Sequence, residues 1–196
     1  MKIAFRAAQY LLVLLSVVTA AQSAKERSLL DDEVTKKGQA LFTDLFLDKK
    51  KASDHVEELR SFTWQTPYDF KVVMAVSYQM LSIRIPPDEA KEILLGAMEA
   101  SAALDLSEKD KVLMRVVAHL CEMYAENDTT WPHLTKLQEL GLPVFEIIGA
   151  ATDLKPQKVT EMSRRNQLRA RPAVKILGRQ FYVKYRGSAA KAIGDQ

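Results

Sequence analysis

Residues 86–102 read PPDEAKEILLGAMEASA, and this stretch carries both a helix start and a helix body. Proline suits the first helical position, and Asp88 and Glu89 place negative charge in the first turn, where the helix dipole favours it. The apolar residues that follow recur at the three- and four-residue spacing of one helix face: Ala90, Ile93, Leu94, Met98 and Ala102. The stretch therefore predicts an amphipathic helix with one face packed on a core.

The same spacing continues outward in both directions along the chain. It predicts further helices over 28–49, 52–64 and 107–126, and prolines at the expected helix starts predict helices over 67–83, 132–141, 143–152, 156–166 and 172–185. Thr66 and Ser107 are expected to cap the helices that follow them, and Gly141 is expected to end the helix before it. No alternating pattern indicates a strand. The sequence predicts an all-α fold, a compact bundle of about seven to eight short helices with short connections.

The first 24 residues have the composition of a secretory signal peptide. Lys2 and Arg6 precede the apolar run YLLVLLSVV at 10–18, and small residues follow. The run is too short to span a bilayer comfortably, since a membrane helix needs about 20 such residues. We therefore expect export with cleavage near Ala21 to Ala24; an uncleaved anchor and an ordinary amphipathic helix are the alternatives. An N-terminal helical segment would then cover 25–55.

Charge is distributed unevenly along the chain. Residues 155–196 contain eleven Lys or Arg and two acidic residues, a net +9, whereas residues 1–154 carry a net −6. Dense positive charge attracts acidic proteins, nucleic acid and anionic membranes. The candidate interaction patch comprises six residues of this segment: Arg164, Arg165, Arg169, Arg171, Lys175 and Arg179. The alternative is a solvated helix surface docked on the chain's own acidic part.

The residue types that carry chemistry give no pattern for an enzyme. His55, His119 and His133 look scattered, without a partner at zinc-site spacing, and no phosphate-binding loop or nucleophile motif is present. Cys121, the one cysteine, continues a helical face and is expected to be buried; a catalytic nucleophile or an intermolecular bridge is the alternative. Trp64 and Phe62 are expected to pack as a hydrophobic staple or core wedge, and a ligand platform is the alternative. The sequence thus predicts no catalytic, cofactor-binding or metal-ligating residues, no cofactor and no small-molecule substrate.

Several segments, in order, resemble the N-terminal domain of phage tail tape-measure proteins. The stretch 59–73, LRSFTWQTPYDFKVV, is similar to the family's L-R-x-F segment leading into T-P-[FY]-x-F, and 134–143, LTKLQELGLP, is similar to its E-L-R-Q-L-x-E-x-G-[IV]-P. The segment 181–190 is similar to the family's closing R-F-x-G-A-x. The resemblance covers 56–192 and gives structural roles to eight motif residues: Thr66, Pro67, Tyr68, Phe70, Leu137, Leu140, Gly141 and Pro143.

The chain also departs from that family. The family usually has Gly where this chain has Arg84, Asn127 and Asn166, and because Arg tolerates the left-handed conformation poorly, the turn at Arg84 is expected to be reshaped. The sequence contains no counterpart of the long helical region that sets tail length in a tape-measure protein, so we do not expect this chain to act as the ruler.

Together these features predict a non-enzymatic, exported helical module that binds a protein partner with acidic character. The alternative is a phage-tail structural or assembly component encoded in a prophage remnant. Binding to nucleic acid or an anionic membrane is a third, weaker reading.

Overall fold

The computed structural model describes residues 24–64, 66–104, 107–127 and 129–194. Over these residues the chain forms ten helices and no strand, which confirms the all-α class and exceeds the expected number of helices by two or three. The expected signal peptide lies almost wholly outside the described residues. The helices are α2 (Ala24–Phe46), α3 (Lys49–Thr63), α4 (Phe70–Ser82), α5 (Pro87–Ala103), α6 (Lys109–Glu126), α7 (Trp131–Glu139), α8 (Val144–Thr152), α9 (Pro156–Arg164), α10 (Ala170–Tyr185) and α11 (Ser188–Gly194).

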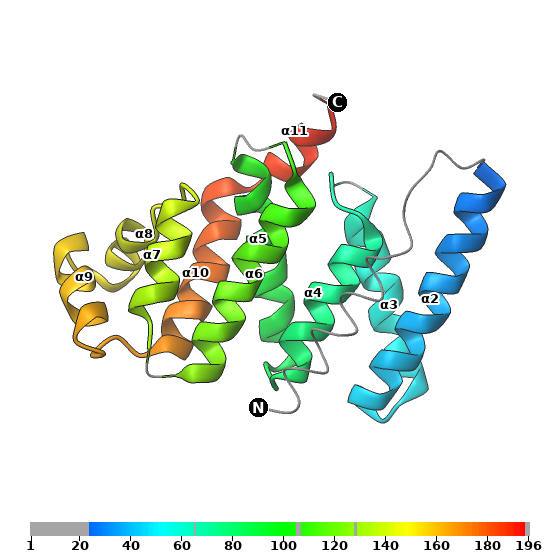
Figure 1. The fold of residues 1–196 in the computed structure, drawn as a ribbon, viewed down its shortest axis with the longest axis horizontal. Helices are drawn as coiled ribbons and strands as arrows, with labels where there is room; N and C mark the ends of the chain where they lie inside the picture. Colours follow the sequence, from blue (N-terminus) through cyan, green and yellow to red (C-terminus); the bar gives the residue numbers. More distant parts are fainter. Residues whose placement is uncertain (1–23, 65, 105–106, 128, 195–196) are drawn as a thin grey trace.

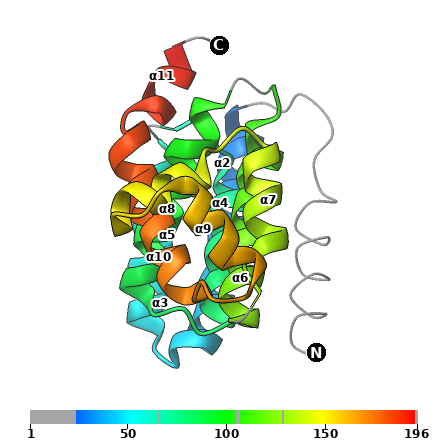
Figure 2. The same ribbon diagram turned by 90° about the vertical axis from the view of Figure 1, so that its left-hand side faces the viewer.

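The helices lie side by side along the long axis of the molecule, from α2 at one end to α9 at the other (Figure 1). Helix α10 departs from the sequence order, because it packs between the α5–α6 pair and α8. Seen from the α9 end, α7, α8 and α9 cover the helices behind them (Figure 2). One continuous hydrophobic core runs through the molecule, from Val34 on α2 to Ala189 on α11. The boundary expected between residues 55 and 56 falls inside α3.

The start of α4 differs from the expectation. Thr66 does not cap the helix, which begins at Phe70, and the N-cap is Asp69, whose carboxylate accepts a hydrogen bond from the backbone N–H of Lys71. Asp is at least as good an N-cap as Thr, so N-cap preference favours Asp69 over Thr66 as the start of the helix. Tyr68 adds a tertiary reason, because it is buried and its hydroxyl donates to the Met98 carbonyl oxygen at 2.7 Å.

Two other helix starts were expected differently from what the structure shows. Ser107 does not cap α6, whose N-cap is Glu108 without a side-chain capping bond. Helix α3 begins at Lys49, directly after α2, because Asp48 accepts hydrogen bonds from the backbone N–H groups of Lys50 and Lys51. The start of α5 after Pro86, with Asp88 and Glu89 in its first turn, is confirmed.

The three positions where the resembling family has glycine all adopt the left-handed conformation. Asn127 has φ 60° and Asn166 φ 54°, and Arg84 has φ 67°. The expectation that the turn at Arg84 is reshaped is therefore wrong. The turn closes α4 with two backbone bonds, from the Arg84 N–H to the Leu81 carbonyl and from the Ile85 N–H to the Met80 carbonyl, and burial of Ile85 offsets the backbone cost.

Candidate functional site

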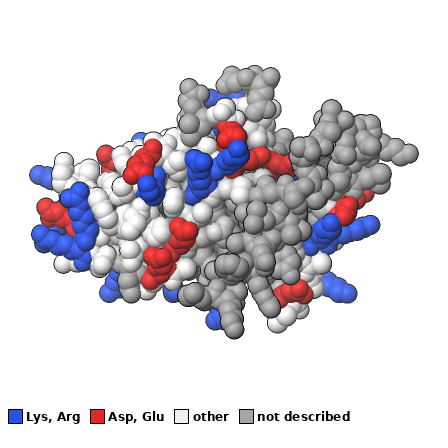
Figure 3. Space-filling model, viewed as in Figure 1, with Lys and Arg blue, Asp and Glu red and all other residues white. Residues whose placement is uncertain are grey.

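The six residues of the basic patch lie around the junction of α9 and α10. Arg164 ends α9, Arg165 follows it, and Arg169 is the N-cap of α10. Arg171, Lys175 and Arg179 lie along α10 at four-residue intervals, so they form one stripe on a single helix face. All six side chains are exposed. On the face drawn in Figure 3, Lys and Arg gather at the α9 end of the molecule with Asp and Glu beside them.

The opposite face of α10 belongs to the core, which fixes the orientation of the stripe. Its buried residues are Ala170, Ala173, Val174, Leu177, Gly178 and Phe181. Any rotation of the helix that hid the basic stripe would expose these apolar side chains to water. The structure therefore presents Arg171, Lys175 and Arg179 on a rigid element.

Aromatic rings and one carboxylate hold part of the patch in place. The Arg164 guanidinium lies 4.4 Å from the centre of the Trp131 ring, and the Arg171 guanidinium lies 5.1 Å from that of Tyr124. Such cation–π contacts position a guanidinium and leave its N–H donors available to another group. Lys175 forms an ion pair with Glu89 of α5 at 3.6 Å.

The junction beneath the patch is tied to the turn between α6 and α7. The Ala170 N–H donates to the Asn127 carbonyl oxygen at 3.4 Å, and the buried hydroxyls of Thr130 and Ser163 hydrogen-bond at 2.7 Å. These bonds join the start of α10 and the end of α9 to one turn. The α9 residues and the α10 residues of the patch are therefore held by the same connection between α6 and α7.

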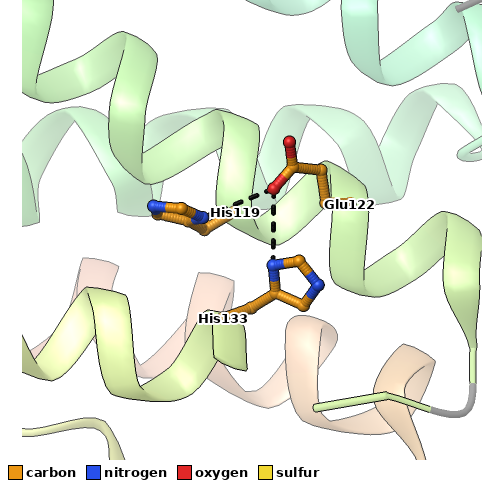
Figure 4. Close-up of side chains that lie close together, drawn as sticks. All are labelled: His119, Glu122 and His133. Carbon is orange, nitrogen blue, oxygen red and sulfur yellow. Dashed lines mark ion pairs between the residues drawn. The ribbon is translucent and has the colours of Figure 1, made fainter. Parts of the chain in front are cut away.

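The expectation that the histidines are scattered is wrong for His119 and His133. Their rings, from α6 and α7, have centres 5.9 Å apart, and the Nδ1 atom of each lies 3.4 Å from the same Glu122 oxygen (Figure 4). The Nε2 atom of His133 lies 3.2 Å from a Glu126 oxygen. Residues 119 and 122 are three apart on one helix, a spacing visible in the sequence, but the return of α7 alongside α6 was needed to add His133.

His55 is separate from this cluster. Its ring packs edge-on against Phe42, with centres 4.7 Å apart, and hydrogen-bonds the Ser77 hydroxyl at 2.9 Å. Burial lowers the pKa of His55, with a smaller opposing contribution from Glu58. This histidine is a structural residue that joins α2, α3 and α4.

The expectations for the cysteine and the tryptophan have opposite outcomes. Cys121 is buried, as expected, and burial raises the pKa of its thiol to about 12, so the thiolate needed for nucleophilic chemistry is scarce at neutral pH.

The Trp64 side chain is 80% exposed, so the expectation that it packs as a core wedge is wrong. It follows the end of α3, and α4 begins six residues later, so Trp64 is too far from that helix to act as its staple. Phe62 packs partly against the core.

The residues of the family motifs occupy two separate connections. Thr66, Pro67 and Tyr68 lie between α3 and α4, and Phe70 is the first residue of α4; Leu137 is buried in the last turn of α7, and Leu140, Gly141 and Pro143 connect α7 to α8. Gly141 has φ +99°, which explains glycine at the end of α7. Both groups shape helix connections.

No family model, no curated protein and no solved structure matches this chain. Within the described residues, no helix has both the length and the apolar composition needed to cross a bilayer.

Proposed function

We propose that the chain is a non-enzymatic, exported helical module that binds an acidic protein through the basic patch of α9 and α10. The single observation that carries the proposal is the stripe of Arg171, Lys175 and Arg179, three exposed cations on one face of a helix whose other face is buried. Cations held on a rigid helix need less ordering on binding than cations on a loop, so they support specific recognition.

A protein partner fits this surface better than a nucleic acid does. Glu89 already pairs with Lys175, and a second ion pair, between Lys158 and Glu161 of α9, places another carboxylate nearby. Phosphate backbones reward an uninterrupted positive surface, because each carboxylate in the contact repels them. A protein surface can match alternating charges with its own, and Arg164 and Arg171 offer side chains oriented by aromatic rings.

The proposal also takes the fold to be of the tape-measure N-terminal type. What supports this is the left-handed conformation at Arg84, Asn127 and Asn166, the three positions where that family usually has glycine. The same observation favours the second candidate function, a phage-tail structural or assembly component from a prophage remnant. Export distinguishes the two, because tails assemble in the cytoplasm.

Charge reversal of the stripe tests the binding surface. The variant carries Arg171→Glu, Lys175→Glu and Arg179→Glu, and its matched control carries Lys49→Glu, Lys50→Glu and Lys51→Glu at the exposed start of α3, which changes the net charge equally. We expect the first variant to lose at least about tenfold in affinity for an acidic partner isolated on the wild-type chain, and the control to bind like wild type.

The readout is titration of the purified partner at several salt concentrations, beside duplex DNA and anionic vesicles as probes. Equal losses in both variants would show that net charge alone matters and would contradict a defined surface. Binding to DNA that depends on the stripe and falls steeply with salt would move nucleic acid into first place.

Expression of the full chain in a Gram-negative host, with fractionation and intact-mass measurement, tests export. We expect a periplasmic product that begins between Gln22 and Lys25, because the apolar run and the small residues after it have the order of a cleavable signal. A full-length cytoplasmic product would contradict export and favour the tail-assembly function.

A further inference from the structure

Three side chains from two helices converge on one point at the α6–α7 pair. One ligand-type atom from each of His119, Glu122 and His133 lies within 4.8 Å of the other two. Figure 4 shows a ring nitrogen of each imidazole facing the same oxygen of the Glu122 carboxylate. We propose that these three residues bind a divalent transition-metal ion of the zinc class, a function that is independent of the basic patch.

The spacing of the atoms suits such an ion. Zinc bonds to imidazole nitrogen and carboxylate oxygen are about 2.0–2.2 Å long, so neighbouring ligand atoms of a tetrahedral site lie about 3.3–3.5 Å apart. The two distances from Nδ1 atoms to the Glu122 Oε2 atom are both 3.4 Å. All three ligand atoms lie within 4.8 Å of one another, so the nitrogen–nitrogen separation is the distance that rotation of the side chains would adjust on binding.

The Nδ1 atom of His119 is a buried polar atom that requires a partner. Among the described residues it makes no hydrogen bond, and the Glu122 oxygen lies 3.4 Å away. A buried nitrogen without a hydrogen-bond partner is destabilising, and native structures rarely leave one. An ion between His119 and Glu122 would satisfy this atom with no change in the positions of α6 and α7.

Glu126 supplies the outer support that metal-binding histidines usually have. Its carboxylate lies 3.2 Å from His133 Nε2, so the ring donates its Nε2–H there and keeps the Nδ1 lone pair free for an ion. The His133 side chain is only 12% exposed, which limits its rotation. Glu126 is a positioning residue, because it acts through His133.

The ligand types select the ion. Two imidazoles and one carboxylate suit zinc and its neighbours, whereas calcium and magnesium prefer sites made of oxygen. The Glu122 side chain is 55% exposed, so a fourth coordination position faces solvent. The ion would link α6 to α7 close to Asn127, whose carbonyl oxygen holds the start of α10.

Calorimetric titration with Zn²⁺ tests the proposal on the full chain, produced without a polyhistidine tag and stripped of metal with a chelator. We expect one ion per chain and no measurable binding of Mg²⁺. His119→Ala and His133→Ala are expected to lose the site, and Glu126→Gln is expected to weaken it about 10- to 100-fold. His55→Gln, which removes an imidazole elsewhere, is the matched control and should bind like wild type.

Glu122→Gln is expected to fold even if the alanine variants do not, because the Glu122 side chain is half exposed and glutamine has nearly the same shape. With circular dichroism unchanged, it should still lose most of the affinity. Excess Zn²⁺ should also raise the melting temperature of the wild type by a few degrees and leave that of Glu122→Gln unchanged. Binding that persists in folded Glu122→Gln and His119→Ala chains, or wild-type binding no tighter than that of Mg²⁺, would overturn the proposal and leave a histidine–carboxylate hydrogen-bond network.

Discussion

The substitution Gly96→Ala is expected to lower the free energy of unfolding by about 3 kcal/mol, toward the upper end of overpacking costs. A Cβ atom at residue 96 would lie 2.0 Å from the carbonyl oxygen of Gly178, a backbone atom of α10 that no rotamer change can move. Gly178 also lies close to α5, since a Cβ there would be 2.9 Å from Ile93 Cα. The two helices touch backbone to backbone, and separating them would loosen the core along both. Urea denaturation, followed by circular dichroism, measures the loss.

Gly38→Ala is the matched control for this substitution. Gly38 is also a buried glycine inside a helix, and a Cβ there would lie 2.5 Å from a side-chain atom, the Met74 sulfur. A methionine side chain can swing aside, and alanine favours the helix by about 1 kcal/mol over glycine. The control should therefore stay within about 1 kcal/mol of wild type. Equal losses in the two variants would contradict the view that the α5–α10 backbone contact is what makes Gly96 indispensable.

The sequence predicted the helices better than it predicted their starts. Helical spacing of apolar residues identified the bodies of α2, α3, α5 and α6, because burial of one face is what stabilises a helix in a protein, and prolines at expected helix starts identified the others up to α10. Caps were harder, since two neighbouring residues can both offer a capping oxygen. Asp69 prevailed over Thr66 because the burial of Tyr68 holds the preceding residues outside the helix, and that contact is tertiary.

The arrangement of the helices in space could not be predicted from the sequence, because it too depends on tertiary contacts. Helix α10 packs mainly against α5, about 80 residues earlier in the chain, and the complementary glycines 96 and 178 that allow this contact carry no local signal. The sequence offered one hint, the two glycines inside helices. Glycine lowers the stability of a helix, so its presence there indicates a place where another element packs closely.

The candidate sites show the same contrast. The stripe of Arg171, Lys175 and Arg179 was accessible from spacing alone, because residues four apart share a face. The histidine cluster was not, although His119 and Glu122 lie one turn apart. Its third member depends on the left-handed Asn127, which ends α6 and directs the chain back so that His133 lies beside it. A prediction that the chain reverses its direction after Asn127 would have placed residues near 119 opposite residues near 133.

The substitution Phe181→Ala is expected to cost about 3–5 kcal/mol, the usual range for removing a fully buried phenylalanine. Phe181 is 0% exposed near the end of α10, where its ring neighbours Tyr185, and its loss leaves a cavity that the surrounding helices can fill only partly. The midpoint of urea denaturation should fall while the slope of the transition stays the same, because the surface exposed on unfolding is nearly unchanged.

Tyr182→Ala is the matched control, an aromatic truncation one residue along the same helix. Tyr182 is partly exposed, with Arg186 over its ring at 5.9 Å, so its loss should cost about 0.5 kcal/mol or less. Because Phe181 lies on the buried face of α10 and the basic stripe on the exposed one, the folded fraction of Phe181→Ala should bind the proposed acidic partner with wild-type affinity. A loss of binding in fully folded Phe181→Ala would mean that the core face of α10, and not its charge alone, sets the geometry of the interaction surface.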